Sequence, residues 1–403
     1  MTAKSVPRPL ARLSVAAAAL FIAAFTLLPS RGPVVTPASW CLFCGEQWVP
    51  DVLLNVALFA PLGAALAAVG MRPRPAVLMG AMLSACIELA QVWIPGRDPS
   101  VRDVLSNTLG AGLGTVLLTY PAWWLSPPLR LARGLAMGWT AAAVSAAWLT
   151  MWLLQPAYPT SIYYGQWTAN LGHLEWYRGR VLSAEVGSMA VRSQRVDDSR
   201  RLRNQLQAES PIVVRATAGP PTSTLGPLFS IYDHRQREII LIGPDRNDLV
   251  YRFRSRGSAL SLQSPEYRAR GLLGDVRRDD SLHVTVTHED RELCLSVNSR
   301  RACGRFHGPE VGWSLLYSAS HPPGWLVALL NVAWLVLLAA PTGFWSRGSG
   351  TLATCGVALV TGTAWASAHW GAPWSLPSLW TAVGLGLGSL TSRVAARHAQ
   401  RRR

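Results

Sequence analysis

The feature that most constrains this 403-residue chain is a series of eight apolar stretches, each close to the roughly 20 residues that a helix needs to cross a bilayer. We therefore predict a polytopic α-helical membrane protein with about eight spans. The first stretch also has the basic start and apolar middle of a signal peptide, but its apolar run is long and no clear small-residue cleavage site follows it. We favour its retention over cleavage. The stretches lie at about 11–29, 52–70, 75–94, 103–120, 131–154, 323–344, 350–369 and 375–392.

Basic residues in the short connecting segments predict the orientation of these spans. Short cytoplasmic loops are enriched in Lys and Arg. If every stretch spans the bilayer, thirteen basic residues and no acidic residue fall in the segments on one side. We therefore expect a multi-pass protein of the cytoplasmic (inner) membrane with both termini in the cytoplasm. The thirteen residues are Lys4, Arg8, Arg12, Arg72, Arg74, Arg130, Arg133, Arg347, Arg393, Arg397, Arg401, Arg402 and Arg403.

The net charge of +16 follows mostly from this orientation. Of the 38 Lys and Arg residues, 37 are Arg, and the long segment 157–322 holds 22 Arg against 17 Asp and Glu. A nucleic-acid-binding domain concentrates its basic residues in one patch, whereas much of the excess here is divided among short cytoplasmic segments. We expect membrane lipids, and no nucleic acid, as partners.

Residues 157–322 differ from the rest of the chain and predict an all-β extracytoplasmic domain. Three runs alternate apolar and polar residues: Asp248 to Arg254, Ser281 to His288 and Glu292 to Val297. Such alternation indicates half-buried strands, and several strands without helical stretches indicate a sandwich or jelly roll. The predicted organisation is a four-span module at 1–125, a fifth span at 126–156, the β domain at 157–322, and three spans with a basic tail at 323–403.

Four of the six cysteines lie in predicted outer segments. Cys294 and Cys303 are symmetric about Asn298–Ser299, so a two-residue hairpin would place them opposite each other, close to disulfide range. Cys41 and Cys44 form a CxxC in the first outer loop, where a zinc site would need more ligands than the sequence offers. We favour structural disulfides in both places, with a redox-active Cys41–Cys44 pair as the alternative.

The other two cysteines, Cys86 and Cys355, fall inside predicted spans. A lone buried cysteine behaves as a small apolar residue, and we assign neither of them a role.

Polar residues recur near one predicted depth of the first four spans. Asp-x-x-x-Asn opens the second and the fourth span, and i, i+4 spacing puts both side chains on one helix face. Carboxylates inside a membrane usually have a partner or a function, although Asp at a first turn also caps a helix. Small residues at Gly110, Gly112 and Gly114 would permit close helix contact. The predicted binding cluster in the outer leaflet is Asp51, Asn55, Glu88, Gln91, Arg97, Asp98, Asp103 and Asn107.

These motifs resemble the VanZ-like family. The shared features are Asp-x-x-x-Asn before Pro61-Leu62-Gly63, the stretch Ile87 to Gln91, Gly96-Arg97, and the run from Asp103 to Gly114. The CLFCG before the second span also occurs in many relatives. The resemblance covers about residues 10–120. It implies a helical membrane module associated with teicoplanin-type resistance, and it supplies no molecular activity.

The outer segment at about 175–318 is similar to the laminin-G-like, concanavalin A-type jelly roll, in which glycan binding and calcium are common. Asp245, Asn247 and Asp248 offer oxygen ligands for calcium, but a turn is the simpler explanation of this Gly-Pro-Asp-Arg-Asn-Asp segment. We assign no other cofactor and no metal site. Six aromatic residues could stack on sugars or belong to the core, which we favour: Trp176, Tyr177, Tyr232, Tyr251, Tyr267 and Trp313.

The sequence contains no nucleophile elbow, HExxH motif or phosphate-binding Gly-rich loop. Glu88 is the one weak candidate for a catalytic base, and Arg97 with Arg102 could hold a phosphate or carboxylate. We favour a non-enzymatic envelope protein that recognises a polar-headed amphiphile or a cell-envelope glycan at the outer leaflet, with glycopeptide-type antibiotic tolerance implied by the resemblance. The alternatives are an enzyme acting on lipid-linked saccharides and a scaffold that displays a glycan-binding domain. The sequence leaves the oligomeric state undetermined.

Overall fold

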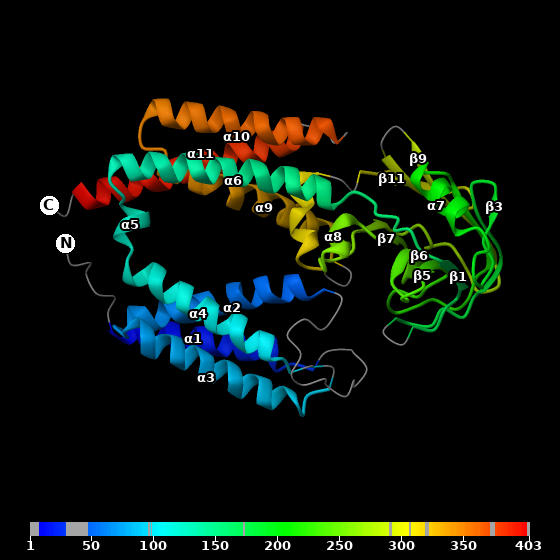
Figure 1. The fold of residues 1–403 in the computed structure, drawn as a ribbon, viewed down its shortest axis with the longest axis horizontal. Coiled ribbons are helices and arrows are strands. Elements are labelled where there is room, and N and C mark those ends of the chain that lie inside the picture. Colours follow the sequence, from blue (N-terminus) through cyan, green and yellow to red (C-terminus); the bar gives the residue numbers. More distant parts are fainter. Residues whose placement is uncertain are drawn as a thin grey trace. The chain divides into compact units, whose positions relative to one another are not determined.

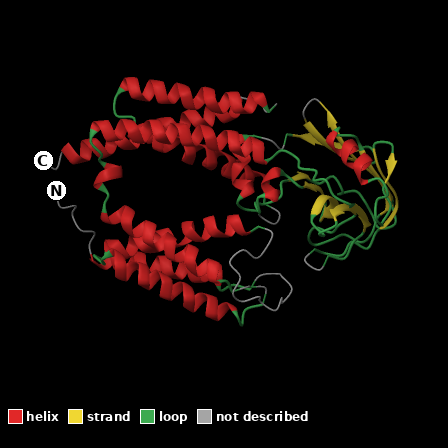
Figure 2. Ribbon diagram, in the orientation of Figure 1, coloured by secondary structure: helices red, strands yellow, loops and turns green. Residues whose placement is uncertain are grey.

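The computed structural model describes residues 8–29, 47–95, 97, 99–171, 174–289, 292–305, 308–318, 322–370 and 375–400. The chain forms two compact units, Met1–Gly134 and Leu135–Arg403. Helices and strands are separated along the chain, with the strands falling between two runs of long helices (Figure 1, Figure 2). Cys41, Cys44 and Asp98, on which sequence predictions rest, lie outside the described residues.

The first unit is helical. Its helices are α1 (Arg8–Thr26), α2 (Trp48–Ala68), α3 (Pro73–Gln91), α4 (Val101–Thr119) and the short α5 (Ala122–Leu125), and α6 (Leu129–Leu153) begins here and continues into the second unit. The second unit also contains α9 (Gly324–Trp345), α10 (Ser349–His369) and α11 (Ser375–Gln400). All eight apolar stretches therefore form helices, with bounds within a few residues of those predicted except at the C-terminal end of α11.

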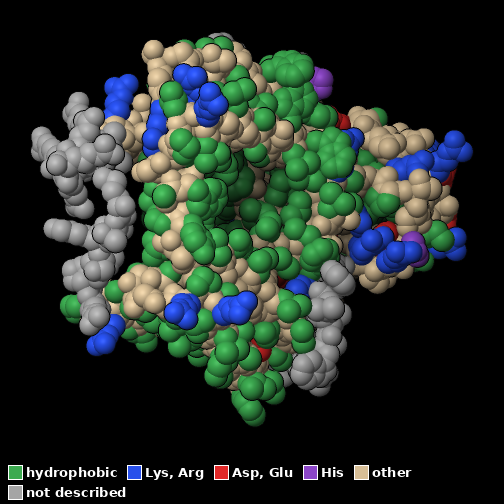
Figure 3. Space-filling view, turned by 60° about the vertical axis from the view of Figure 1, so that its left-hand side comes forward, with side chains coloured by type: hydrophobic (Ala, Val, Ile, Leu, Met, Phe, Trp, Pro, Cys, Tyr) green, Lys and Arg blue, Asp and Glu red, His purple; other side chains and the backbone are tan. Residues whose placement is uncertain are grey.

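Among the described residues, five helices are long and apolar enough to cross a membrane: α1 from Pro9, α2, α6, α9 and α10. Helices α3 and α4 fall short of this measure, and both carry charged residues: Arg74 and Glu88 in α3, Arg102 and Asp103 in α4. On the face shown in Figure 3, hydrophobic side chains cover much of the helical surface, as lipid contact requires. A span count beyond five stays a prediction.

Helices α2 and α4 pack backbone against backbone through glycine. A Cβ atom added at Gly63 would lie 1.9 Å from the carbonyl oxygen of Ala111, and one at Gly114 would lie 1.8 Å from that of Ala60. At Gly110 the corresponding distance, to the carbonyl oxygen of Val56, is 2.3 Å. The prediction of close contact is therefore confirmed for Gly110 and Gly114.

Gly112 does not take part in this contact. A Cβ atom there would meet only Cγ2 of Val77 on α3, at an ordinary 3.5 Å. The prediction was wrong for this residue because position 112 lies on a different face of α4 from 110 and 114, which are four residues apart.

The inserted segment of the second unit is a β-sandwich-like region of two antiparallel sheets. One has the order β1-β5-β6-β7-β8 and the other β11-β10-β9-β4-β2-β3. The strands are β1 (Tyr163–Trp167), β2 (Arg180–Val186), β3 (Met189–Ala190), β4 (Ile212–Thr217), β5 (Phe229–Asp233), β6 (Glu238–Asp245), β7 (Asp248–Phe253), β8 (Glu266–Ala269), β9 (Ser281–Glu289), β10 (Glu292–Val297) and β11 (Arg300–Gly304).

Both sheets contribute to one hydrophobic core. Phe229 and Ile231 of β5 and Ile240 of β6 are fully buried in it, together with Val214 of β4 and Val284 of β9. The three alternating runs singled out in the sequence form β7, β9 and β10, which confirms the strand prediction.

Short helices also occur in this region, which contradicts the expectation of strands alone. They are α7 (Ser199–Gln207), α8 (Arg256–Ala259) and the 3₁₀ helix η1 (Pro309–Leu315). In α7, Leu202 and Leu206 are buried and four residues apart, and the Asp198 carboxylate accepts the backbone N–H of Arg201 as an N-cap. Nine residues with many charges carry too weak an apolar signal to stand out in the sequence.

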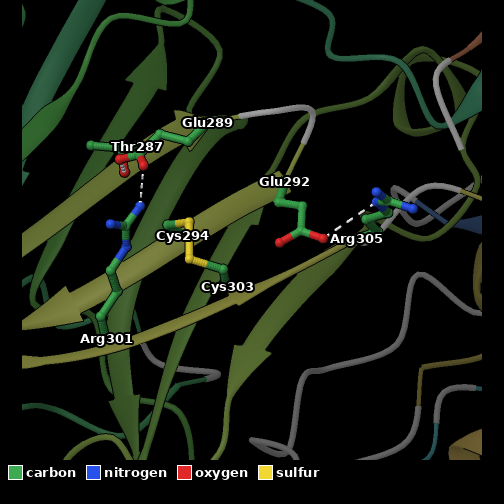
Figure 4. Close-up of a disulfide and its surroundings, with 7 residues drawn as sticks. All are labelled: Thr287, Glu289, Glu292, Cys294, Arg301, Cys303 and Arg305. Carbon is green, nitrogen blue, oxygen red and sulfur yellow. Dashed lines mark hydrogen bonds and ion pairs between the residues drawn. A yellow bond between two sulfur atoms is a disulfide. The ribbon is translucent and has the colours of Figure 1, made fainter.

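The predicted hairpin disulfide is present. Cys294 of β10 and Cys303 of β11 are directly paired in the ladder and are joined by a disulfide bond (Figure 4). The turn between them contains Asn298 at a positive φ of 54°, a conformation that asparagine tolerates well. Cys86 and Cys355 are free thiols.

Asp233 ties together one end of the β5–β6 hairpin. Its carboxylate is fully buried and accepts the backbone N–H groups of Arg235 at 2.8 Å and Arg237 at 2.9 Å. The guanidinium groups of Arg237 and Arg254 lie 3.1 and 3.7 Å from it. Burial alone would raise the pKa of Asp233, but these hydrogen bonds and charges outweigh burial and hold the pKa below its ordinary value.

We predict that Asp233→Asn lowers the free energy of unfolding of the β region by about 3 kcal/mol at neutral pH, because two guanidinium groups lose their carboxylate. The folded-state pKa is lowered, so this stabilisation is present above the ordinary Asp pKa of about 3.9 and is lost as the pH falls through the folded-state value. Thermal unfolding of both proteins at neutral and acidic pH measures it. The exposed Asp279→Asn is the control, and equal melting temperatures for all three proteins at pH 7 would refute the prediction.

Candidate functional site

Three helix ends bring together four of the eight polar residues predicted for the site, Asp51, Asn55, Glu88 and Asp103. Helices α2 and α4 begin at Trp48 and Val101, and each has an aspartate in its first turn, Asp51 and Asp103. Helix α3 ends at Gln91, one turn beyond Glu88. We call Asp51, Glu88 and Asp103, together with Arg102, the carboxylate cluster.

Arg102 links the two aspartates. Its Nη2 lies 3.3 Å from Oδ2 of Asp51, and its Nε lies 3.5 Å from Oδ1 of Asp103. Asn55, one turn after Asp51 on α2, hydrogen-bonds the Asp103 carboxylate. The Arg102 side chain is 13% exposed and that of Asp51 is 52% exposed, so the cluster opens to the surface at Asp51.

Glu88 forms the buried side of the cluster. It is 8% exposed, and its Oε2 accepts the backbone N–H of Ser100 at 2.8 Å. Ser100 is the N-cap residue of α4 and makes no side-chain cap bond, so Glu88 ties the end of α3 to the start of α4. It is also within electrostatic range of Arg102 and Asp103. This contact gives Glu88 a structural role whether or not it binds a ligand.

Gln91 and Arg97 point elsewhere. Nε2 of Gln91 donates to the carbonyl of Thr26 at 3.0 Å. The Arg97 guanidinium donates to the carbonyls of Phe25 at 2.8 Å and Leu28 at 3.0 Å. Both side chains therefore satisfy carbonyl groups at the C-terminal end of α1, an arrangement that spacing along α3 did not indicate.

Asn107 lies deeper than the cluster. It is 2% exposed and donates from Nδ2 to Oγ of Ser84 at 2.9 Å, which joins α4 to α3. Its Oδ1 has no hydrogen-bond partner among the described residues. Ser84 was missed in the sequence, although it precedes Glu88 by one helical turn and so shares its face.

The charge of the cluster is unbalanced. Among the described residues, three carboxylates face one guanidinium when ionised, and the positive ends of α2 and α4 offset only part of this excess. Arg102 is engaged by two aspartates and Arg97 by α1, so both arginines considered for phosphate binding already have partners within the chain. The arrangement favours a ligand group that is cationic or donates hydrogen bonds.

The β region contains a cavity of about 210 Å³. Its polar lining includes His288 of β9, Gln207 of α7 and Glu209, and Tyr158 and Tyr251 hydrogen-bond each other in its wall. Burial lowers the pKa of His288, although the charge of Glu209 acts in the opposite direction. Nδ1 of this ring has no hydrogen-bond partner in the described parts of the chain.

The other residues considered for ligand binding in this region have structural contacts. Tyr177, Tyr232 and Tyr251 are buried, as favoured from the sequence, whereas Trp176 is 51% exposed under the Arg178 guanidinium. Tyr267 packs partly buried against the core, and the indole of Trp313 donates to Asn331.

Asp245 and Asp248 flank a two-residue turn, which confirms the simpler interpretation of this segment. Both carboxylates contact the Arg268 guanidinium, at 2.7 and 3.4 Å.

Comparison with known proteins identifies the part of the chain that holds the cluster. Residues 15–124 match the VanZ/LLP1 family. The match spans 110 of 403 residues and contains α2, α3 and α4 with all four residues of the carboxylate cluster. Among curated proteins and among solved structures, no match to the chain was found.

We predict that Arg102→Gln destabilises the VanZ-like part by about 1–3 kcal/mol, because it leaves the carboxylates without their guanidinium. Arg102→Gln combined with Asp103→Asn should recover part of the loss by removing one of the repelling charges. Thermal unfolding followed by tryptophan fluorescence measures both, with the exposed Arg278→Gln as the control. A double variant less stable than Arg102→Gln alone would contradict charge balance as the function of Arg102.

Proposed function

We propose that this protein is a non-enzymatic envelope protein whose VanZ-like part binds the polar head of an amphiphile at the outer leaflet of the cytoplasmic membrane. The observation that carries the proposal is the convergence of Asp51, Glu88 and Asp103 on one guanidinium at the ends of three helices. Intramembrane carboxylates are costly, and their excess over cations is unexplained by the fold alone. The excess favours a head group rich in hydroxyl or ammonium donors, as in a glycolipid or a lipid-linked saccharide.

The proposed sidedness is supported by the distribution of charge along α2 and α3. The cluster lies at the start of α2 and at the end of α3, and Arg72 and Arg74 lie where α2 and α3 are connected at their opposite ends. With the basic end in the cytoplasm, the cluster faces outward, both termini are cytoplasmic, and residues 157–322 are extracytoplasmic.

We further propose that the β region is a laminin-G or concanavalin A-type jelly roll that binds a cell-envelope glycan. Its two antiparallel sheets are compatible with such a fold, and the cavity lined by His288, Gln207 and Glu209 offers polar groups beside aromatic walls. We also propose a role in envelope stress, including tolerance of glycopeptide-type antibiotics, which the resemblance of residues 15–124 to the VanZ/LLP1 family implies.

We predict that Glu88→Gln abolishes lipid retention, because the amide keeps the shape of the side chain but removes its charge. Wild-type protein is extracted from native membranes in mild detergent, and the co-purifying lipids are identified by mass spectrometry. The matched control is Thr108→Val, since among the described residues the Thr108 hydroxyl on α4 bonds only to the carbonyl of Val104 in its own helix. One lipid class should be retained by wild type and Thr108→Val and fall at least about tenfold in Glu88→Gln.

Equal retention by Glu88→Gln and wild type, at equal protein yield, would contradict the binding role of the cluster. Incubation of purified protein with the retained lipid distinguishes binding from the enzyme alternative. A new product that forms with wild type but not with Glu88→Gln would show that the cluster catalyses a reaction. A strain whose chromosomal copy carries Glu88→Gln should share the glycopeptide sensitivity of a deletion strain. Wild-type sensitivity would remove the proposed link to tolerance.

For the β region we predict that His288→Ala reduces saccharide binding at least about tenfold, because the variant removes the imidazole ring from the lining of the cavity. The probe is an array of cell-envelope saccharides screened with the detergent-purified full chain. His283→Ala is the matched control, since the exposed His283 alternates with the buried Leu282 and Val284 on the same strand and lies outside the cavity. Equal binding by His288→Ala and wild type would refute the cavity as the site.

A further inference from the structure

Two helix pairs, one in each unit of the chain, make the same set of backbone contacts. We infer that the chain contains a second, diverged copy of the VanZ-like module, formed by α6, α9, α10 and α11, and that the β region is inserted between the first two helices of this copy. The family match covers only residues 15–124, so the second copy is outside what it identifies.

The contacts between α9 and α11 repeat those between α2 and α4 residue by residue. In the first pair, Gly63, Gly110 and Gly114 lie against the backbone of Ala111, Val56 and Ala60. In the second pair, Gly343, Gly384 and Gly388 lie against the backbone of Leu385, Val336 and Ala340. A single shift of 280 residues relates α2 to α9, and a single shift of 274 relates α4 to α11, in all three contacts.

The distances agree closely for two of the three contacts. The third is longer in the second pair, at 2.9 Å from a Cβ atom at Gly384 to the carbonyl oxygen of Val336, against 2.3 Å from Gly110 to that of Val56. A Cβ atom at Gly343 would lie 2.1 Å from the carbonyl oxygen of Leu385, against 1.9 Å for Gly63 and Ala111. One at Gly388 would lie 1.9 Å from that of Ala340, against 1.8 Å for Gly114 and Ala60. Two unrelated helix pairs can share a glycine contact by chance, but three contacts in one register require the same rotation and axial offset of both helices.

The sequences agree at these shifts. Val56 to Gly63 (VALFAPLG) aligns with Val336 to Gly343 (VLLAAPTG) and shares Val, Leu, Ala, Pro and Gly. Gly110 to Gly114 (GAGLG) aligns with Gly384 to Gly388 (GLGLG) and differs at one position. Neither Gly112 nor its counterpart Gly386 takes part in the close contact. A Cβ atom at Gly112 would lie 3.5 Å from Cγ2 of Val77, and one at Gly386 would have no described neighbour within 4 Å.

The third helix follows the same pattern. A Cβ atom at Gly80 of α3 would lie 2.5 Å from Cβ of Ala111, and one at Gly356 of α10 would lie at an ordinary 3.6 Å from Cδ1 of Leu385, so both glycines face the same position of the neighbouring helix. Leu385 is the counterpart of Ala111 at the shift already set by α11. Helix order also agrees, since α6, α9, α10 and α11 succeed one another as α1 to α4 do.

The second copy has lost the carboxylates. At the shifts of α2 and α4, Asp51 corresponds to Asn331 and Asp103 to Pro377. The shift of α3, which Gly80 and Gly356 set, makes Ala364 the counterpart of Glu88. At these three positions, the carboxylates therefore belong to the first copy alone.

The end of the second copy that corresponds to the cluster contacts η1, a short helix of the same chain. The Trp313 indole of η1 donates to Oδ1 of Asn331 at 2.7 Å. A Cβ atom at the neighbouring Gly312 would lie 2.7 Å from the Trp334 indole and 2.8 Å from the Thr150 hydroxyl of α6. The position that carries Asp51 in the first copy has become an attachment point for the inserted β region.

The test is a set of glycine-to-alanine variants in the full chain, compared by melting temperature and folded yield in detergent. Gly63→Ala, Gly110→Ala and Gly114→Ala, and their counterparts Gly343→Ala, Gly384→Ala and Gly388→Ala, should each lower the folded fraction at least about tenfold, because the new Cβ meets backbone atoms. Gly112→Ala and Gly386→Ala are the matched controls. Both should leave the melting temperature unchanged or raise it, because alanine favours the helix.

The same order of effects in both halves is the expected result. The inference is overturned if Gly386→Ala is as damaging as Gly388→Ala, or if the variants of α9 and α11 are tolerated while those of α2 and α4 are not. Because the readout is folding, the outcome is independent of whether the carboxylate cluster binds a lipid.

Discussion

The backbone contact between α2 and α4 is the constraint on which the rest of the VanZ-like part depends. At Gly63, Gly110 and Gly114 there is no room for any side chain, so the register of the two helices is fixed to within a fraction of a turn. Val56, which contacts Gly110, is five residues after Asp51, and Gly110 is seven residues after Asp103. At a rise of about 1.5 Å per residue, the contact therefore places both aspartates at nearly the same level.

The charges of the two aspartates, which lie at nearly the same level, explain the contacts around them. Arg102 contacts both aspartates, and Glu88 approaches from α3 to accept the N–H of Ser100. Arg102 offsets part of the charge of the two aspartates, and Glu88 satisfies a backbone N–H group at the start of α4. These polar groups therefore have partners within the apolar bundle. Among the described residues two carboxylates remain in excess, and this excess distinguishes the cluster from ordinary helix capping and motivates a ligand with hydrogen-bond donors.

The sequence predicted features that depend on local spacing. The apolar stretches predicted all eight long helices, and the symmetry of Cys294 and Cys303 about a turn predicted the disulfide. Asp51, Asn55, Glu88 and Asp103 were expected to converge, and they do. These features depend on periodicity along one element or on residues close in the chain.

Features that depend on which helix packs against a residue could not be predicted from spacing along the chain. Gln91 and Arg97 share the region of the cluster in sequence, yet they donate to carbonyl groups near the end of α1. Gly112 shares a motif with Gly110 and Gly114 but faces α3. The repeat of the helix pair in α9 and α11 was equally difficult to predict from the sequence. Short glycine motifs are common in membrane helices, and only the matching contacts show that the two pairs share a register.

We propose that the carboxylate cluster opens to the outer face of the membrane. The most direct measurement is thiol labelling of Asp51→Cys and Arg72→Cys by a membrane-impermeant reagent in right-side-out vesicles, with Cys86 replaced by Ser in both. Asp51 is half exposed, and Arg72 lies at the opposite end of α2. We expect labelling of Asp51→Cys in intact vesicles and of Arg72→Cys only after permeabilisation. The reverse pattern would place the cluster on the cytoplasmic side and contradict the proposed orientation.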